Sequence, residues 1–276
     1  MTMPSSPRRK ARAATTMPAA DARLLEVSID AGVAHVRLNR PAKRNALSDG
    51  LIAALHDTFS SMPPAVHVVV LSGEGDHFCA GLDLSELQDR SATEGLVHSR
   101  QWHAAFEEIQ FGRVPVVAVL QGAVVGGGLE LASSAHIRVA ESSAFFALPE
   151  GTRGLFVGGG GSARISRLIG VSRMTDMMLT GRVFDAAQAQ QTGLVNYLAE
   201  PGTGLAMAMD LARRIAANAP LSNFAIIHAL PRIADQSQGD GLFTESLMAS
   251  ITQSDPAAKS RMRAFLAGKA RKVTRS

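Results

Sequence analysis

The sequence predicts an α/β fold, because strand-sized apolar runs alternate along it with segments of helical periodicity. The longest apolar runs, 66–71 and 114–120, have the length of buried strands and fall far short of the ~20 apolar residues of a membrane span. The stretch between them, 93–111, repeats apolar residues at helical spacing. Hydrophobic residues make up 46% of the 276 and charged residues 19%, which supplies ample core for one globular α/β body.

The first predicted element is a β-hairpin. Residues 25–29 and 33–38 alternate in polarity on either side of Asp30-Ala31-Gly32. The elements that follow are a helix capped by Ser48 and running to about Phe59, a strand at 66–71, a helix at 93–111, a strand at 116–120, a helix from about Gly127, and short strands at 137–140 and 145–148. Right-handed crossovers between such strands give a mostly parallel sheet.

Beyond about residue 160 the pattern is helical, apart from a short strand expected at Leu194–Tyr197. The domain organisation expected from these patterns is a leader at 1–20, an α/β core at 21–200 and a helical C-terminal region at 201–276. The leader contains four cations and no acid, and its Ser, Pro and Ala content predicts disorder. It could be a transit-like segment, a small tail or an over-extended start, since Met17 precedes the first strand.

The charge of the chain argues against nucleic acid as a partner. The formal net charge is +4, from 28 basic and 24 acidic residues. The leader holds four of the basic residues, so 24 of each sign remain and the body is neutral, without a basic stripe for a phosphate backbone. Cys79 is the only cysteine, which excludes an internal disulfide, fits a cytoplasmic location and predicts a small buried side chain. No histidine spacing typical of a metal site occurs.

Three loops concentrate unusual residue choices. The first, 77–84, contains Ala80-Gly81-Leu82-Asp83, where small residues let backbone approach a ligand closely and free the Leu82 N–H. Asp83 with Glu86 also matches a helix-capping pair, which is the plainer interpretation of that carboxylate.

The second loop, 121–130, places Gly126-Gly127-Gly128 at the start of a helix and Glu130 in its first turn. Free N–H groups and the helix dipole suit an oxyanion that develops during a reaction. A phosphate site is the competing interpretation, but the run lacks both the Gly-Lys-Ser/Thr of a P-loop and the spacing of a dinucleotide fingerprint. Alone, Glu130 could simply offset the helix dipole.

The third loop contains Pro149-Glu150-Gly151, which by itself is typical of an ordinary turn. The tract 158–161, four glycines followed by Arg164 and Arg167, could be a flexible connection or a weak anion site. The turns near 82, 127 and 150 each follow a predicted strand, so one parallel sheet would gather them at one edge, where open α/β sheets bind ligands. Two N–H donors and two carboxylates would then converge.

Several segments together resemble the crotonase (enoyl-CoA hydratase/isomerase) superfamily from about residue 22 to the C-terminus. The matching segments, in the family's order, are Asn39-Arg40-Pro41-Ala42-Lys43-Arg44-Asn45-Ala46-Leu47, Phe78-Cys79-Ala80-Gly81-Leu82-Asp83-Leu84, Gly126-Gly127-Gly128-Leu129-Glu130-Leu131-Ala132, Pro149-Glu150 and Leu179-Thr180-Gly181. The resemblance implies a crotonase-like ββα spiral core with a helical C-terminal trimerisation region, assembled as a homotrimer or a dimer of trimers.

The resemblance also implies a role for each site residue. Leu82 and Gly127 would supply the oxyanion-hole N–H groups, with Leu82 replacing the more usual alanine. Glu150 would transfer the proton at the α-carbon, and Glu130 would position and activate water at the β-carbon. Retention of both acids favours an enoyl-CoA hydratase over an isomerase or a hydratase/lyase for aromatic substrates, and a non-catalytic acyl-CoA binder is the remaining alternative.

The segment from Asn39 to Leu47 is similar to the family's coenzyme A loop. The resemblance implies substrate contacts from Ala42, Lys43, Arg44, Ala80 and Asp83, although the two cations could equally be solvated loop charges. Coenzyme A belongs to the substrate, so no separate cofactor or metal is expected.

Two side-chain groups leave an alternative open. His98, Trp102 and Phe106 share one helix face, which would line an acyl pocket or pack in the core. The methionines at 174, 177 and 178 could belong to a subunit interface or to the core.

Overall fold

A mixed six-stranded sheet forms the centre of the protein. The computed structural model describes residues 24–86 and 89–269. The strand order is β1-β2-β3-β4-β6-β9, in which only the β1–β2 pair is antiparallel. The strands are β1 (Leu25–Asp30), β2 (Val33–Leu38), β3 (Val68–Gly73), β4 (Val116–Leu120), β6 (Ile137–Glu141) and β9 (Tyr197–Ala199). The predicted hairpin is confirmed, and Ala31 and Gly32 both have positive φ at its two-residue turn.

A second, smaller sheet was not predicted. It consists of β5 (Ala123–Val125), β7 (Phe145–Ala147) and β8 (Phe184–Asp185), in the order β5-β7-β8. A parallel bridge between Cys79 and Val124 adds the preceding loop to its edge. The strand expected at Leu194–Tyr197 was placed too early, because Leu194 and Val195 are buried in the turn before β9.

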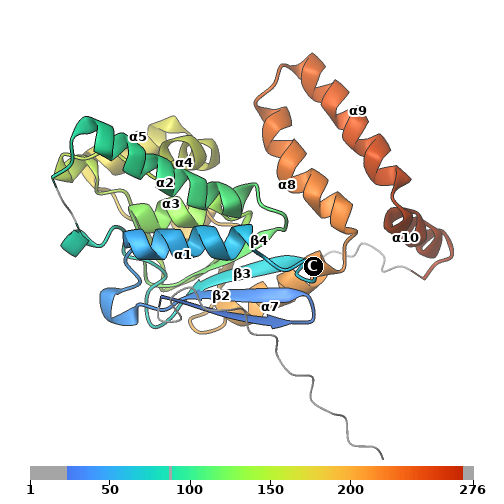
Figure 1. Ribbon diagram of the computed structural model, residues 1–276, viewed down its shortest axis with the longest axis horizontal. Coiled ribbons are helices and arrows are strands. Elements are labelled where there is room, and N and C mark those ends of the chain that lie inside the picture. The colour runs from blue at the N-terminus through green and yellow to red at the C-terminus, as the bar shows by residue number, and fades with distance from the viewer. Residues whose placement is uncertain (1–23, 87–88, 270–276) are drawn as a thin grey trace, which may run out of the picture.

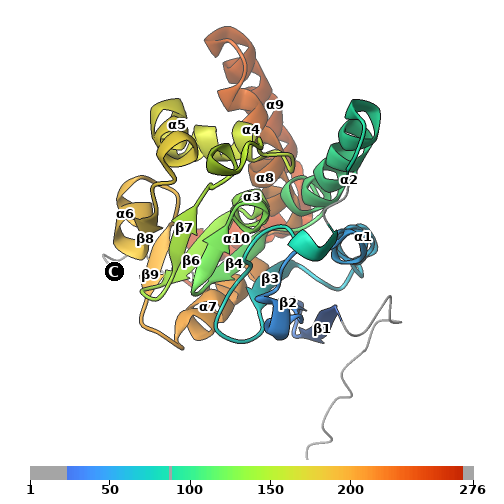
Figure 2. The same ribbon diagram turned by 90° about the vertical axis from the view of Figure 1, so that its left-hand side faces the viewer.

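Helices cover both faces of the main sheet (Figures 1 and 2). On one face lie α1 (Asp49–Ser60), α2 (Ala92–Gln110) and α3 (Gly127–Ser134), followed by α4 (Gly161–Ile169), α5 (Val171–Thr180) and α6 (Ala186–Gln191). The first three helices agree with the prediction, including the Ser48 cap, whose side chain accepts the Leu51 N–H. Met174 and Met177 are buried, so this part of the methionine group belongs to the core.

The opposite face of the sheet is covered by α7 (Gly204–Ala216). Its Ala208, Leu211 and Ala212 pack on a separate apolar layer formed by valines of β2, β3, β4 and β6. The α/β core therefore extends beyond residue 200, where its end was expected. The helices that stand away from the sheet are α8 (Pro220–Ala234), α9 (Gln238–Ser254) and α10 (Pro256–Leu266), as Figure 1 shows.

Among the described residues, no helix combines the length and the hydropathy that a membrane-spanning helix needs.

Candidate active site

Glu130 is a buried carboxylate held by a glycine loop. It lies in the first turn of α3, every residue of which is buried, and only 3% of its surface is exposed. Its Oε1 accepts the N–H groups of Gly159 and Gly161, each at 2.8 Å. Burial raises the pKa of Glu130, while these N–H groups and the Arg164 charge oppose the rise.

The glycine loop is an anion site, but the anion is the protein's own carboxylate. A methyl group at Gly161 would lie 2.7 Å from the Glu130 Cγ, and one at Gly159 would lie 3.3 Å from its Cδ. Side chains here would therefore push the loop away from Glu130. The glycines and arginines of 158–167 indicated a weak anion site, but no local pattern could identify which group this loop binds.

Glu150 lies in the turn after β7 and begins a short 3-10 helix, Gly151–Arg153. Its side chain is half-buried, and its Oε2 is buried without a hydrogen-bond partner among the described residues. Burial raises the pKa of Glu150, and the negative charge of Glu130 raises it further. The two glutamates therefore influence each other, as a shared site requires.

The Glu150 carboxylate lies against the start of α3. A methyl group at Gly126 would be 2.6 Å from the Glu150 Oε1, and Gly126 itself has φ 55° and ψ −123°, which glycine adopts without strain. Gly126 precedes Gly127, the expected oxyanion donor, so Glu150 and that N–H are neighbours.

The Leu82 and Gly127 backbones also come together. A methyl group at Gly81 would lie 3.7 Å from the Gly127 nitrogen. Leu47 fixes the turn on both sides, donating its N–H to the Gly81 oxygen and accepting the Asp83 N–H. Among the described residues, neither the Leu82 N–H nor the Gly127 N–H has a protein acceptor. Two free donors at the N-terminus of a buried helix can stabilise a developing oxyanion.

The convergence was predicted, but its predicted cause was wrong. The expectation was one parallel sheet that gathers all three turns at one edge. Instead the small sheet gathers them, through the parallel pairing of β5 with β7 and the Cys79–Val124 bridge. Strands β3 and β4 of the main sheet pair with each other and directly precede the loop that contains Cys79 and strand β5, respectively. The main sheet therefore positions the two chain segments that enter the small sheet.

Trp102, from α2, forms a wall of this site. A methyl group at Gly127 would lie 2.8 Å from its Cζ3, and one at Gly159 would lie 3.2 Å from its Cε3. Its ring packs edge-on against Phe106, with centroids 5.9 Å apart. Trp102 and Phe106 are both buried in the core, and Trp102 also lies against the glycines of the site. An acyl-pocket role for the 98–106 face stays a prediction.

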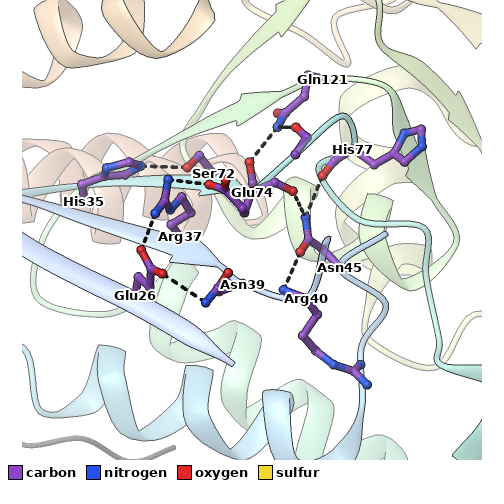
Figure 3. Close-up of polar contacts among 12 residues, drawn as sticks. Glu26, His35, Arg37, Asn39, Arg40, Asn45, Ser72, Glu74, His77 and Gln121 are labelled. Atoms are coloured by element: carbon purple, nitrogen blue, oxygen red, sulfur yellow. Dashed lines mark hydrogen bonds and ion pairs between the residues drawn. The ribbon is translucent and has the colours of Figure 1, made fainter. Parts of the chain in front are cut away.

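Hydrogen bonds of the Asn45 side chain hold the loop that is expected to contact coenzyme A. The Asn45 side chain accepts the Arg40 N–H and donates to the carbonyl oxygens of Glu74 and His77 (Figure 3). Ala42 and Lys43 lie in the 3-10 helix Pro41–Lys43, and Arg44 follows in the left-handed region with φ 50°. All three are exposed and therefore accessible to a ligand.

Ala80 and Asp83 connect this loop to the oxyanion turn. The Ala80 N–H donates to the Arg44 oxygen, and the Asp83 carboxylate pairs with Arg40 at 2.8 Å and accepts the Ser85 N–H and hydroxyl. The Ser85 hydroxyl and Arg40 lower the pKa of Asp83 to about 2. A ligand contact of Asp83 stays a prediction, because its buried carboxylate already has these partners.

The capping pair predicted from Asp83 and Glu86 is only half formed. Asp83 caps the 3-10 helix Leu84–Glu86 through Ser85, but the Glu86 carboxylate accepts the Asp49 N–H at the start of α1. Cys79 is buried, and burial raises the pKa of its thiol to about 12, as expected for an inert side chain. Within the described ranges no cluster of histidine, cysteine or acidic side chains could hold a metal ion.

Burial of Glu130 gives a testable prediction for stability. A raised pKa means that the folded state favours the protonated carboxyl group of Glu130. The contribution of this preference to stability is complete below the pKa of Glu130 in the unfolded chain, and it is lost as the pH rises through the pKa in the folded protein. Glu130→Gln keeps an oxygen for Gly159 and Gly161 and removes the buried charge. We expect a higher Tm than the unaltered chain at pH 8, by about 2–4 °C per kcal/mol gained, and a smaller difference near pH 4. A Tm that falls equally at both pH values would contradict this.

The comparisons with known proteins show the family and the fold of this chain. The family model described as "Enoyl-CoA hydratase/isomerase" matches residues 28–272. The short-chain-enoyl-CoA hydratase of Clostridium acetobutylicum is 34% identical over 193 residues, which cover 69% of this chain and 74% of that protein. The enoyl-CoA isomerase/hydratase of Mycosarcoma maydis is 31% identical over 225 residues, which cover 78% of this chain and 82% of that protein.

Solved structures give the same result. A crystal structure from Rhodopseudomonas palustris CGA009, of a protein that its name assigns provisionally to the enoyl-CoA hydratases, is 58% identical with a TM-score of 0.88, covering 92% of this chain and 98% of that one. The enoyl-CoA hydratase of Bacillus anthracis is 28% identical with a TM-score of 0.84, covering 89% and 97%. The crotonase-like fold expected from the sequence is confirmed, and the chain belongs to the enoyl-CoA hydratase/isomerase family.

Proposed function

We propose that this protein is an enoyl-CoA hydratase, which adds water across the 2,3 double bond of a trans-2-enoyl-CoA to give a 3-hydroxyacyl-CoA. One observation carries the proposal. The buried Glu130 and the half-buried Glu150, two carboxyl groups with raised pKa, lie beside the two free N–H donors of Leu82 and Gly127. Hydration of an activated alkene needs an anchor for enolate charge, a base for water and an acid for carbon.

The thioester oxygen would bind between the Leu82 and Gly127 N–H groups. As the oxygen of water bonds to the β-carbon, the alkene electrons move toward that thioester oxygen, and the charge that develops there meets the two N–H groups and the dipole of α3. Neither donor must break a bond to another protein group first, so the site is already arranged for the enolate.

Glu130 and Glu150 would share the proton transfers. Both backbone hydrogen bonds to Glu130 end on Oε1, which leaves Oε2 to take a proton from water. Glu150 would give its proton to the α-carbon, and its raised pKa favours the protonated form that this step needs. After the addition Glu130 holds a proton taken from water, while Glu150 has lost its own proton to the α-carbon. Exchange of protons with solvent returns both groups to their starting states.

The loop from Ala42 to Arg44 would bind the nucleotide part of coenzyme A. Its backbone would contact the adenine, and the exposed Lys43 and Arg44 would pair with phosphates. Ala80 and Asp83 would complete this side of the site. The proposed chemistry uses neither a metal nor a redox cofactor, and the single cysteine fits a cytoplasmic protein.

We also propose a homotrimer or a dimer of trimers. Helices α8 and α9 stand away from the sheet and expose large apolar side chains, including Phe224, Leu230, Leu242, Phe243 and Leu247. Burial of such side chains against another copy is favourable. Light scattering coupled to size exclusion tests the assembly, and a monomer at micromolar concentration would contradict it.

A substrate panel tests the hydratase activity. We expect loss of the conjugated enoyl-thioester absorbance with at least one trans-2-enoyl-CoA among short, long, branched and aromatic acyl groups, unchanged by EDTA, with 3-hydroxyacyl-CoA identified by mass spectrometry. A double-bond shift without gain of water would instead identify an isomerase, and cleavage of the acyl group would identify a lyase. Binding without any turnover across the panel would identify an acyl-CoA binder and contradict the proposal.

A further inference from the structure

Arg164 connects α4 to the glycine loop that holds Glu130. Its Nη1 donates to the Gly159 oxygen at 2.8 Å, and its Nε donates to the Gln110 Oε1 at 2.6 Å at the end of α2. Gly160 has φ 91° and no side chain. A methyl group at this position would clash with the guanidinium of Arg164. The guanidinium is therefore fixed at two points, and one of them is the loop itself.

Gly159 is held on both sides of its Cα. Its N–H donates to the Glu130 carboxylate, while its carbonyl accepts from Arg164. A movement of the guanidinium therefore shifts a group that directly contacts the carboxylate. Within the described residues Arg164 has no carboxylate in ion-pair range, although the charges of Glu107 and Glu130 both act on it. Its positive charge thus acts on Glu130 from behind the loop.

We propose that Arg164 is a positioning residue for Glu130, which sets the orientation and ionisation of this carboxylate through Gly159. The inference rests on the proposed function for its kinetic consequences only. Arg164 acts on Glu130 in two ways. Its two hydrogen bonds fix the position of the glycine loop, and its positive charge affects the ionisation of the carboxylate. Different substitutions separate them, because lysine keeps the charge but not the planar two-sided donor geometry.

The kinetic test uses three variants. For Arg164→Gln we expect kcat to fall about 10- to 100-fold, because small misplacements of a catalytic group have effects of this size, while KM stays close to that of the unaltered chain. Loss of the positive charge raises the pKa of Glu130, so the acid limb of the kcat–pH profile moves to higher pH. Arg164→Lys should lower kcat but leave the acid limb of the kcat–pH profile nearly unmoved. Gln110→Leu removes one of the two hydrogen bonds of the guanidinium, so it should have the same effects as Arg164→Lys.

A spectroscopic test does not depend on turnover. Trp102 is the only tryptophan in the chain, and a methyl group at Gly159 would be within 3.3 Å of both its ring and the Glu130 carboxyl carbon. A pH titration of its emission should therefore contain a step from Glu130, identified because Glu130→Gln removes it. In Arg164→Gln this step should move to higher pH.

Arg167→Gln is the matched control. Arg167 lies one turn further along α4 and forms an exposed ion pair with Asp235, so its loss should leave both the kinetic profile and the emission step unchanged. An Arg164→Gln chain that melts like the unaltered protein yet keeps its kcat, acid limb and emission step would overturn the inference. If Arg164→Gln does not fold, unchanged profiles in Arg164→Lys and Gln110→Leu would overturn it equally. An unaltered chain that hydrates nothing would refute the proposed function, and the emission step would still decide the role of Arg164.

Discussion

Glu150→Gln is expected to lower kcat for a trans-2-enoyl-CoA by about 10²–10⁴-fold, the usual contribution of a general acid or base. The amide has nearly the same shape as the carboxyl group, but it cannot give a proton to the α-carbon. Glu130→Gln is expected to have an effect of similar size, because the amide cannot take the proton from water. Stopped-flow or steady-state loss of enoyl absorbance measures both, and calorimetry with the 3-hydroxyacyl-CoA product measures binding.

Binding should survive these changes, since neither glutamate supplies the oxyanion-hole N–H groups or the loop that would hold coenzyme A. The matched control is Glu141→Gln. Glu141 is also a buried acid, 9% exposed, but its Oε1 accepts the Gly204 N–H at the start of α7, on the other side of the sheet. We expect this variant to keep kcat. Turnover within about twofold of the unaltered chain in Glu130→Gln or Glu150→Gln would remove that residue from the mechanism.

The second large effect is expected for Gly81→Ala. Gly81 has φ 100°, which an alanine adopts only with strain, and the added methyl would lie 2.8 Å from the Val125 oxygen. Relief of that clash must move the peptide that carries the Leu82 N–H. Removal of one oxyanion donor typically costs about 10²–10³ in kcat, and we expect a loss in this range, with KM less affected.

The control for Gly81→Ala introduces similar backbone strain elsewhere. Gly202 has φ 78° in the turn before α7, and a methyl group there would meet nothing within 4 Å. Gly202→Ala should therefore lower Tm moderately and leave kcat unchanged. Equal kcat losses in the two variants would mean that general destabilisation, and not the oxyanion geometry, explains the result.

The main sheet and its helices could be predicted because their signals are local. The alternation around Asp30-Ala31-Gly32, the Ser48 cap and the apolar strand 116–120 depend on residues a few positions apart. The small sheet could not be predicted, since β5 and β7 have three residues each and β8 has two. Such short strands carry almost no periodicity, and their pairing depends on contacts between distant segments.

Glu130 and Glu150 show the same division within the site. The sequence determined that both acids are present, that each lies in a segment that follows a predicted strand, and that glycines at 126–128 free the backbone beside Glu130. Only the tertiary structure decided that β5 and β7 pair and bring Glu150 against Gly126, and that the loop at 159–161 folds onto Glu130. The physical reason is distance along the chain. A carboxylate's ionisation depends on burial and on N–H groups that lie about thirty residues away in sequence, and no local pattern specifies such contacts.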